Sequence, residues 1–239
     1  MKNVSLFFSW AQALITDFFA LLLVIFLHCF SFFYTPKKHL EKQDGRPILL
    51  VHGYCNTSSV WIYIQWKLIQ SRIGPVFVLN LRHPFDSIRK HVQTLSYKVD
   101  QIEKETGSKE IILIGHSMGG IISTLYATEK APAHKIIDVI TIGSPLRGTH
   151  LAKLGLGKDA REMEMHSPLL QEMQKRVQLN KSIRFYHIAS KTDTLVMPYQ
   201  SSWIEGRMHK KRIFSGIGHV GLLYSPRVCS QILDWIYSL

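Results

Sequence analysis

The feature that most constrains the fold of this chain is an apolar run at residues 111–114 that leads directly into Gly-His-Ser-Met-Gly. Beyond that turn, apolar side chains recur at helical spacing, at Ile121, Ile122, Leu125 and Tyr126. The pattern G-x-S-x-G between a strand and a helix is typical of a nucleophile elbow, which holds a serine in a strained turn at the top of a sheet. Glycines flank the serine because the two backbones pass too close for a Cβ atom. Ser117 is therefore the candidate nucleophile, although the pentapeptide alone often marks an ordinary turn.

The length and charge of the chain limit the other classes of function. Its 239 residues fit one α/β domain with a small appendage. The net charge of +12 favours a polyanion or an anionic membrane surface, or simply keeps the protein soluble. No nucleic-acid motif is present, and the aromatic residues do not interleave with the basic ones, so we expect no nucleic-acid partner. Three scattered cysteines give no metal-ligand spacing, and a bridge between Cys55 and Cys229 stays open.

The N-terminal segment, residues 1–35, is predicted to be a membrane anchor. Residues 18–27 are all apolar, and a stretch that starts near residue 11 reaches the ~20 residues that a bilayer requires. Asp17 is costly near the middle of a span and is better tolerated at an interface. The stretch lacks a small-residue cleavage site, so an anchor that spans or lies in the interface is favoured over a cleaved signal peptide. A core helix is the weaker alternative, because residues 36–46 then resemble a polar linker.

Basic residues flank the predicted anchor on both sides. Lys2 precedes it, and Lys37, Lys38 and Lys42 follow it. The larger number of lysines on the C-terminal side leans slightly toward a domain that faces the cytoplasm, while the side of the membrane stays uncertain.

Residues 47–239 are predicted to form the catalytic domain, with alternating strands and helices. Such alternation indicates a mostly parallel sheet flanked by helices, joined by right-handed crossovers. The expected strands lie in residues 47–54, 76–79, 111–114, 136–142, 183–189 and 212–214. A helix capped at Thr57 or Ser58 should follow the first strand, and a long amphipathic helix from Ile88 should end at Gly107. The fold class is therefore α/β.

The first strand of this domain ends in His52-Gly53. Enzymes with a nucleophile elbow place their second oxyanion donor at such a strand end. The expected donors are the backbone N–H groups of Tyr54 and Met118, aimed at the oxygen that becomes negative when Ser117 attacks a carbonyl. A structural role for His52 in orienting the loop is more plausible than a role in proton transfer.

The acid and the histidine of a triad should follow the nucleophile in that order. Asp193 comes just past the end of a strand, where open α/β sheets build their sites. His219 lies among glycines that let a loop carry the ring into a crowded site, so it is the predicted general base. Asp138 is the second choice of acid because it lies within a strand. His187 and His209 fit less well as bases.

The helical pattern changes at residues 150–180. Ser167 and Pro168 start a short helix there, and Met163 and Met165 add adaptable apolar surface. The segment is interpreted as a cap over the site, with ordinary packing as an equal alternative.

With these residues in place, the chain from Pro47 onward resembles the α/β-hydrolase superfamily, most closely the small bacterial triacylglycerol lipases and esterases. The shared points are His52-Gly53, the elbow at residues 115–120, the strand end at residues 143–149, Asp193 and the Gly-His219 loop. The resemblance implies hydrolysis of carboxylic esters, often lipid esters, without an organic cofactor. Leu146 departs from these lipases, which often have histidine there. No calcium-binding acids are obvious near His219, so no metal site is predicted.

The leading hypothesis is thus a membrane-associated lipase or esterase. A phospholipase, thioesterase, amidase or acyltransferase would use the same triad, because all of them share an acyl-enzyme. A non-enzymatic, membrane-tethered binding module is the third hypothesis, and a complete triad argues against it. The basic run at residues 207–212 is expected to be a solvated loop rather than a headgroup site. The natural substrate and the oligomeric state stay undetermined by sequence.

Overall fold

A six-stranded, entirely parallel sheet forms the centre of the protein. The computed structural model describes residues 2–30, 45–81, 83–206 and 208–238. The predicted linker at residues 36–46 falls almost wholly outside these ranges. The strand order is β2-β1-β3-β4-β5-β6, and each neighbouring pair is parallel. The strands are β1 (Ile48–Val51), β2 (Val76–Leu79), β3 (Ile111–His116), β4 (Ile136–Ile142), β5 (Arg184–Ser190) and β6 (His209–Phe214).

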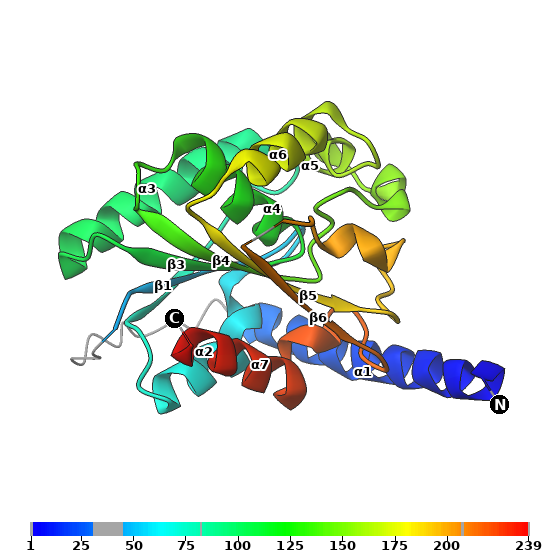
Figure 1. The fold of residues 1–239 in the computed structure, drawn as a ribbon. Coiled ribbons are helices and arrows are strands. Elements are labelled where there is room, and N and C mark those ends of the chain that lie inside the picture. The colour runs from blue at the N-terminus through cyan, green and yellow to red at the C-terminus, as the bar shows by residue number, and fades with distance from the viewer. Residues whose placement is uncertain (1, 31–44, 82, 207, 239) are drawn as a thin grey trace.

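Helices cover both faces of the sheet, as Figure 1 shows. Alternate strand residues point to opposite faces, so Leu49 and Val51 belong to one buried apolar cluster and Ile48 and Leu50 to the other. The first cluster includes residues of α3 (Ile88–Thr106), α4 (Met118–Leu125) and α6 (Pro168–Leu179), and the second those of α2 (Ile62–Gln70) and α7 (Pro226–Tyr237). The predicted α/β sandwich of helices around a parallel sheet is therefore confirmed.

Local signals placed most element ends correctly. Gly107 adopts φ 71° and closes α3, and the side chain of Ser167 accepts a hydrogen bond from Leu170 N at the start of α6. Thr57 occupies the N-cap position of a short 3₁₀ turn, Ser58–Trp61, but its side chain makes no capping bond. Neither of the predicted caps, Thr57 and Ser58, caps α2 itself, which begins after Trp61. Cys55 and Cys229 are both free thiols, so the bridge left open by sequence does not form.

Strand β6 differs from the prediction. It begins at His209, so most of the basic run expected to be a loop is an edge strand. Lys210, Lys211 and Arg212 are exposed. An edge strand has solvent along one side, and exposed charges there discourage pairing with another chain. The predicted strand at residues 212–214 is therefore the second half of β6, and its first half was missed because it lacks the alternating apolar pattern.

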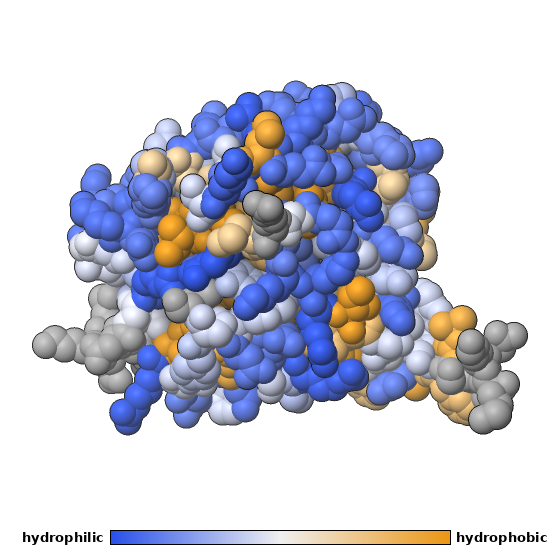
Figure 2. Space-filling model, viewed as in Figure 1, coloured by the Kyte–Doolittle hydropathy of each residue, from blue (hydrophilic) through white to orange (hydrophobic). Residues whose placement is uncertain are grey.

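Helix α1 (Lys2–Phe30) lies along the domain on the side of α2 and α7 (Figure 1). Its window Leu6–Phe26 is long and apolar enough to cross a membrane. One narrow stripe faces the protein, with Ala13 and Ala20 buried, while large apolar side chains cover the outer surface. The orange atoms at the lower right of Figure 2 belong to this end of the molecule. The structure therefore has an apolar N-terminal helix that contacts the domain in its middle.

Candidate active site

Ser117 occupies the sharp turn between β3 and α4. Its backbone has φ 55° and ψ −127°, a conformation that side chains rarely adopt. A Cβ atom on Gly115 would lie 2.4 Å from the carbonyl oxygen of Gly119, and one on Gly119 would lie 2.1 Å from that of Val51. Both glycines of the pentapeptide are thus required by close backbone approach. The turn has the geometry expected of a nucleophile elbow.

Asp193 and His219 meet beside this turn. The Nδ1 atom of His219 lies 2.9 Å from Oδ2 and 3.0 Å from Oδ1 of Asp193. The backbone N–H groups of Leu195 and Val196 each donate to Asp193 Oδ1 at 2.8 Å, which fixes the carboxylate. Because Nδ1 is engaged by the acid, Nε2 is the nitrogen left to exchange a proton with a partner in the pocket.

The charge environment favours the protonated form of His219. Burial lowers the pKa of the ring, but the charge of Asp193, its hydrogen bond and the charge of Asp17 outweigh burial and raise the pKa above the ordinary value. A positively charged imidazole would therefore be stabilised at this place, as a general base requires once it has accepted a proton.

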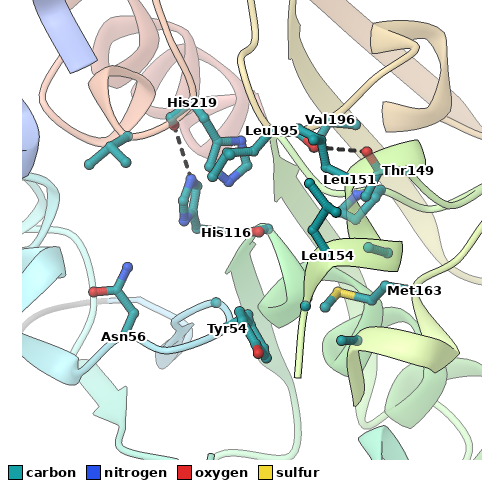
Figure 3. Close-up of a pocket in the computed structure, with 17 residues that line it drawn as sticks. Tyr54, Asn56, His116, Thr149, Leu151, Leu154, Met163, Leu195, Val196 and His219 are labelled. Atoms are coloured by element: carbon teal, nitrogen blue, oxygen red, sulfur yellow. Dashed lines mark hydrogen bonds between the residues drawn. The ribbon is translucent and has the colours of Figure 1, made fainter. Parts of the chain in front are cut away.

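Ser117 and His219 line the same cavity, which has a volume of about 400 Å³. Most of the remaining wall is apolar and comes from the segment after β4 (Figure 3). The 3₁₀ turn His150–Leu154 contributes Leu151 and Leu154, and Met163 follows α5 (Gly157–Glu162). In Figure 3 these three side chains face the cavity from the side opposite His116. Such a wall suits an apolar chain next to a reacting carbonyl.

Two backbone N–H groups near Ser117 have no acceptor among the described residues, those of Tyr54 and Met118. Tyr54 follows Gly53, where an added Cβ would lie 2.7 Å from Cβ of Ser117. Met118 is the first residue of α4. The two predicted oxyanion donors therefore flank the serine and remain available for a ligand.

A sequence profile describing the alpha/beta hydrolase fold matches residues 46–181, more than half of the chain. The chain belongs to the α/β-hydrolase family.

Curated relatives of this α/β-hydrolase match over less than half of the chain. It is 36% identical over 114 residues to triacylglycerol lipases of Pseudarthrobacter phenanthrenivorans and Burkholderia plantarii. Each alignment covers 44% of this chain, but 35% of the first lipase and 31% of the second. A lysosomal thioesterase of Xenopus laevis is 30% identical over 113 residues, which cover 44% of this chain and 38% of that protein. The matching segment thus spans about a third of the length of these relatives.

Solved structures share the fold over most of the chain. The mature form of the Bacillus licheniformis lipase BlEst2 has a TM-score of 0.70 and 16% identity, covering 84% of this chain and 96% of the lipase. Aspergillus fumigatus lipase B has a TM-score of 0.72 and 16% identity, covering 85% of this chain and 55% of that one. At this identity the likeness concerns the fold alone.

Asp138, the second choice of acid, does not belong to the site of this hydrolase. It lies near the opposite end of β4, fully buried, and accepts hydrogen bonds from Arg184 at 2.7 and 2.8 Å and from Arg46 at 3.0 Å. A buried carboxylate between two arginines ties strands together at the N-terminal edge of the sheet. Asp138 thus lies within β4 and not past the end of the strand, which is the feature that ranks it below Asp193 in the sequence.

Three further histidines are held in structural roles. His52 accepts a hydrogen bond from Leu81 N at Nε2 and contacts its neighbour Gly53 O through Nδ1, and burial lowers its pKa to about 4. His187 contacts Thr141 at 2.9 Å, and burial lowers its pKa to about 3. Nδ1 of His209 donates to the backbone carbonyl of Ile204, in the loop before β6, at 2.6 Å. As expected, His52 orients the loop that carries Tyr54.

His116 is a site residue that the sequence reasoning missed. It precedes Ser117 in the elbow, is buried, and its Nε2 lies 3.2 Å from the carbonyl oxygen of His219 (Figure 3). The two imidazole rings are 4.7 Å apart. Burial holds the pKa of His116 well below the ordinary value, so the neutral ring donates to the histidine loop. The elbow pattern leaves this position unspecified, and only the tertiary contact reveals its use.

Proposed function

We propose that the protein is a serine hydrolase that cleaves carboxylic esters, with lipid esters as the preferred class. The observation that carries the proposal is the Asp193–His219 pair at the cavity that also holds Ser117 in its strained turn. His219 takes the Ser117 proton as the hydroxyl attacks the ester carbonyl, and Asp193 orients the imidazole and stabilises its charged form. The released alcohol receives that proton, and water then frees the acyl group from the enzyme.

The N–H groups of Tyr54 and Met118 would stabilise the oxyanion of the tetrahedral intermediate, each by about 3 kcal/mol. The apolar wall contributed by residues 150–163 would hold the acyl chain, which supports the interpretation of this segment as a cap over the site. Helix α6, which also lies in the predicted cap at residues 150–180, packs instead in the main core through Leu170, Met173 and Val177. No group of three metal-ligating side chains gathers within the described part of the chain.

Labelling with a fluorophosphonate tests the proposal most directly. The full chain should be modified once, at Ser117, and Ser117→Ala should abolish labelling while the circular dichroism spectrum is retained. A folded wild-type protein that is not labelled would refute the enzyme and favour a binding module built on the same fold.

A thioesterase is the second candidate, because one curated relative is named as a thioesterase. Thioesters and oxygen esters share the acyl-enzyme and differ in the leaving group. Paired oxygen ester and thioester substrates with the same acyl chain distinguish the two activities, since the deacylation step is common to both.

We further propose that α1 attaches the enzyme to a membrane surface while lying in the interface. The outer side of the helix exposes Phe7, Leu14, Phe18, Leu22 and Phe26. Its middle is bonded to the loop that carries His219, so a span from residue 6 to residue 26 would place this loop at the depth of the bilayer centre. An interfacial helix avoids that cost, and the net charge of +12 adds attraction to anionic lipids.

Vesicle sedimentation tests the attachment. The full chain should sediment with phosphatidylglycerol-containing vesicles, and the double substitution Leu14→Asn and Leu22→Asn should release it because each change removes exposed apolar surface from α1. Equal sedimentation of this variant and the wild type would refute the interfacial attachment.

A further inference from the structure

The middle of helix α1 is bonded to the two loops that carry the acid and the histidine. The carboxylate of Asp17 accepts hydrogen bonds from the backbone N–H of His219 at 2.9 Å, from that of Gly221 at 2.9 Å and from the hydroxyl of Thr194 at 2.7 Å. Thr16 adds a bond from Gly218 N at 3.2 Å. One carboxylate therefore spans both loops, 202 residues away from His219 in sequence.

The histidine loop is shaped to receive this carboxylate. A Cβ atom on Gly218 would lie 2.1 Å from Cγ of Asp17, and one on Gly216 would lie 2.6 Å from the side chain of Gln12. The sequence suggested that these glycines admit the imidazole into a crowded site. The structure gives them a different reason, because they let α1 approach the backbone of the loop.

Resting on the function proposed above, we propose that Asp17 is a positioning residue for the catalytic histidine. His219 is held at its ring by Asp193, at its carbonyl oxygen by His116 and at its backbone N–H by Asp17. Without the Asp17 carboxylate, the backbone N–H groups of His219 and Gly221 and the hydroxyl of Thr194 lose their shared acceptor. The imidazole of His219 is then held less firmly relative to Ser117. Helix α1 thus completes the active site rather than serving only as an attachment.

The charge of Asp17 also acts on the imidazole. The described titratable groups that face His219 are Asp193, Asp17 and His116. Asp193 and Asp17 both raise the pKa of His219. The ring of His116 is neutral, so it adds no opposing charge. Removal of the Asp17 charge should therefore lower the pKa of His219. This change separates a positioning role from a purely architectural one.

The test compares Asp17→Asn with Asp234→Asn, a matched change of an exposed carboxylate on α7. Both full-length variants are assayed in detergent micelles with a water-soluble short-chain ester, and rates are normalised by titration of active sites with a fluorophosphonate. A charge-assisted bond network of this kind supports a loss of about tenfold to a hundredfold in kcat for Asp17→Asn. KM should stay within about twofold because Asp17 does not line the cavity.

The acidic limb of the kcat/KM profile should also move to lower pH in Asp17→Asn and stay in place in Asp234→Asn. If kcat falls in Asp17→Asn but the acidic limb of its kcat/KM profile does not move, Asp17 has only an architectural role and the proposal is overturned. Equal kcat values and equal pH profiles for Asp17→Asn and Asp234→Asn would also overturn it. If Asp17→Asn does not fold, Thr194→Val removes one donor to the same carboxylate and should reduce kcat by about twofold to tenfold. Wild-type rates in that variant would overturn the proposal.

Failure of the proposed hydrolase activity is recognised separately. In that case the wild type is not labelled at Ser117. The pKa of His219, measured by NMR with ¹³C-labelled histidine, then tests whether Asp17 acts on the imidazole. A lower His219 pKa in Asp17→Asn than in Asp234→Asn would support the contact, and equal values would refute it.

Discussion

Both carboxylate oxygens of Asp193 lie within 3.0 Å of the same atom, Nδ1 of His219. This arrangement keeps the proton on Nδ1 and directs Nε2 toward the cavity that Ser117 lines. The consequence can be tested with a substitution that keeps the shape of the acid and removes its charge.

Asp193→Asn should lower kcat for ester hydrolysis by about four orders of magnitude, because the amide presents a donor to Nδ1 and favours the wrong tautomer. Stopped assays on active-site-titrated protein measure the loss. Asp138→Asn, in the acid that sequence ranked second, serves as the comparison. A smaller loss of kcat in Asp193→Asn than in Asp138→Asn would contradict the assignment of Asp193 as the acid of the triad.

Asp138→Asn should act on stability instead of turnover. Its carboxylate is fully buried between Arg46 and Arg184, and breaking a buried ion pair costs about 3–5 kcal/mol. Urea unfolding should reveal this loss, while kcat per titrated active site stays near that of the wild type at a temperature where the variant is folded.

The pH profile of the wild type follows from the raised pKa of His219. The ring must be neutral to accept the Ser117 proton, so activity is lost as the pH falls through that pKa. The charges of Asp193 and Asp17 raise the pKa of His219 by more than burial lowers it. The midpoint of the acidic limb of kcat/KM should therefore lie above the ordinary histidine pKa of about 6.5. A midpoint below this value would contradict the charge environment described here.

Leu154→Lys should reduce activity on long-chain esters more than on acetate esters. Leu154 lines the cavity yet is 81% exposed, so it forms the rim that an acyl chain would cross. Leu179→Lys is a matched control, because Leu179 is 79% exposed and lies outside the cavity. We expect about a tenfold change in the long-to-short ratio of kcat/KM for Leu154→Lys, in line with the loss of one large apolar contact. Equal long-to-short ratios for the two variants would show that the acyl chain does not pass Leu154.

Gly119→Ala should destabilise the fold by more than Gly107→Ala. A Cβ atom at position 119 meets backbone oxygens of Val51 and His52 at 2.1 and 2.6 Å, whereas one at position 107 meets nothing within 4 Å. The Gly107 variant has only the cost of its positive φ, about 1 kcal/mol, and the Gly119 variant should lose about 3 kcal/mol or more. Equilibrium unfolding of the two proteins gives the comparison.

The strands, the elbow and the pair of acid and histidine could be predicted from sequence because each depends on local signals. Continuous apolar runs specify strands buried on both faces, and the glycines at 115 and 119 reflect a packing need that recurs in every elbow. The order of Ser117, Asp193 and His219 along the chain then follows from the positions of the strand ends.

The contribution of α1 could not be predicted in the same way. In the sequence, Asp17 is only a costly charge within a predicted membrane segment, because its partners lie about 200 residues away and no periodicity links them. The fold brings the helix to the histidine loop through glycines whose purpose is visible only in three dimensions. Strand β6 was partly hidden for a related reason, because an edge strand needs no apolar alternation.

The wide separation of Asp17 from its partner loop also bears on how the protein is made. Helix α1 emerges from the ribosome well before β5, β6 and the histidine loop, because it precedes all of them in the chain. Throughout that interval the carboxylate of Asp17 lacks the three donors that it has in the folded protein, Thr194, His219 and Gly221. Helix α1 would then dock only once the histidine loop has been synthesised, so the catalytic histidine would reach its final position in a late step of folding.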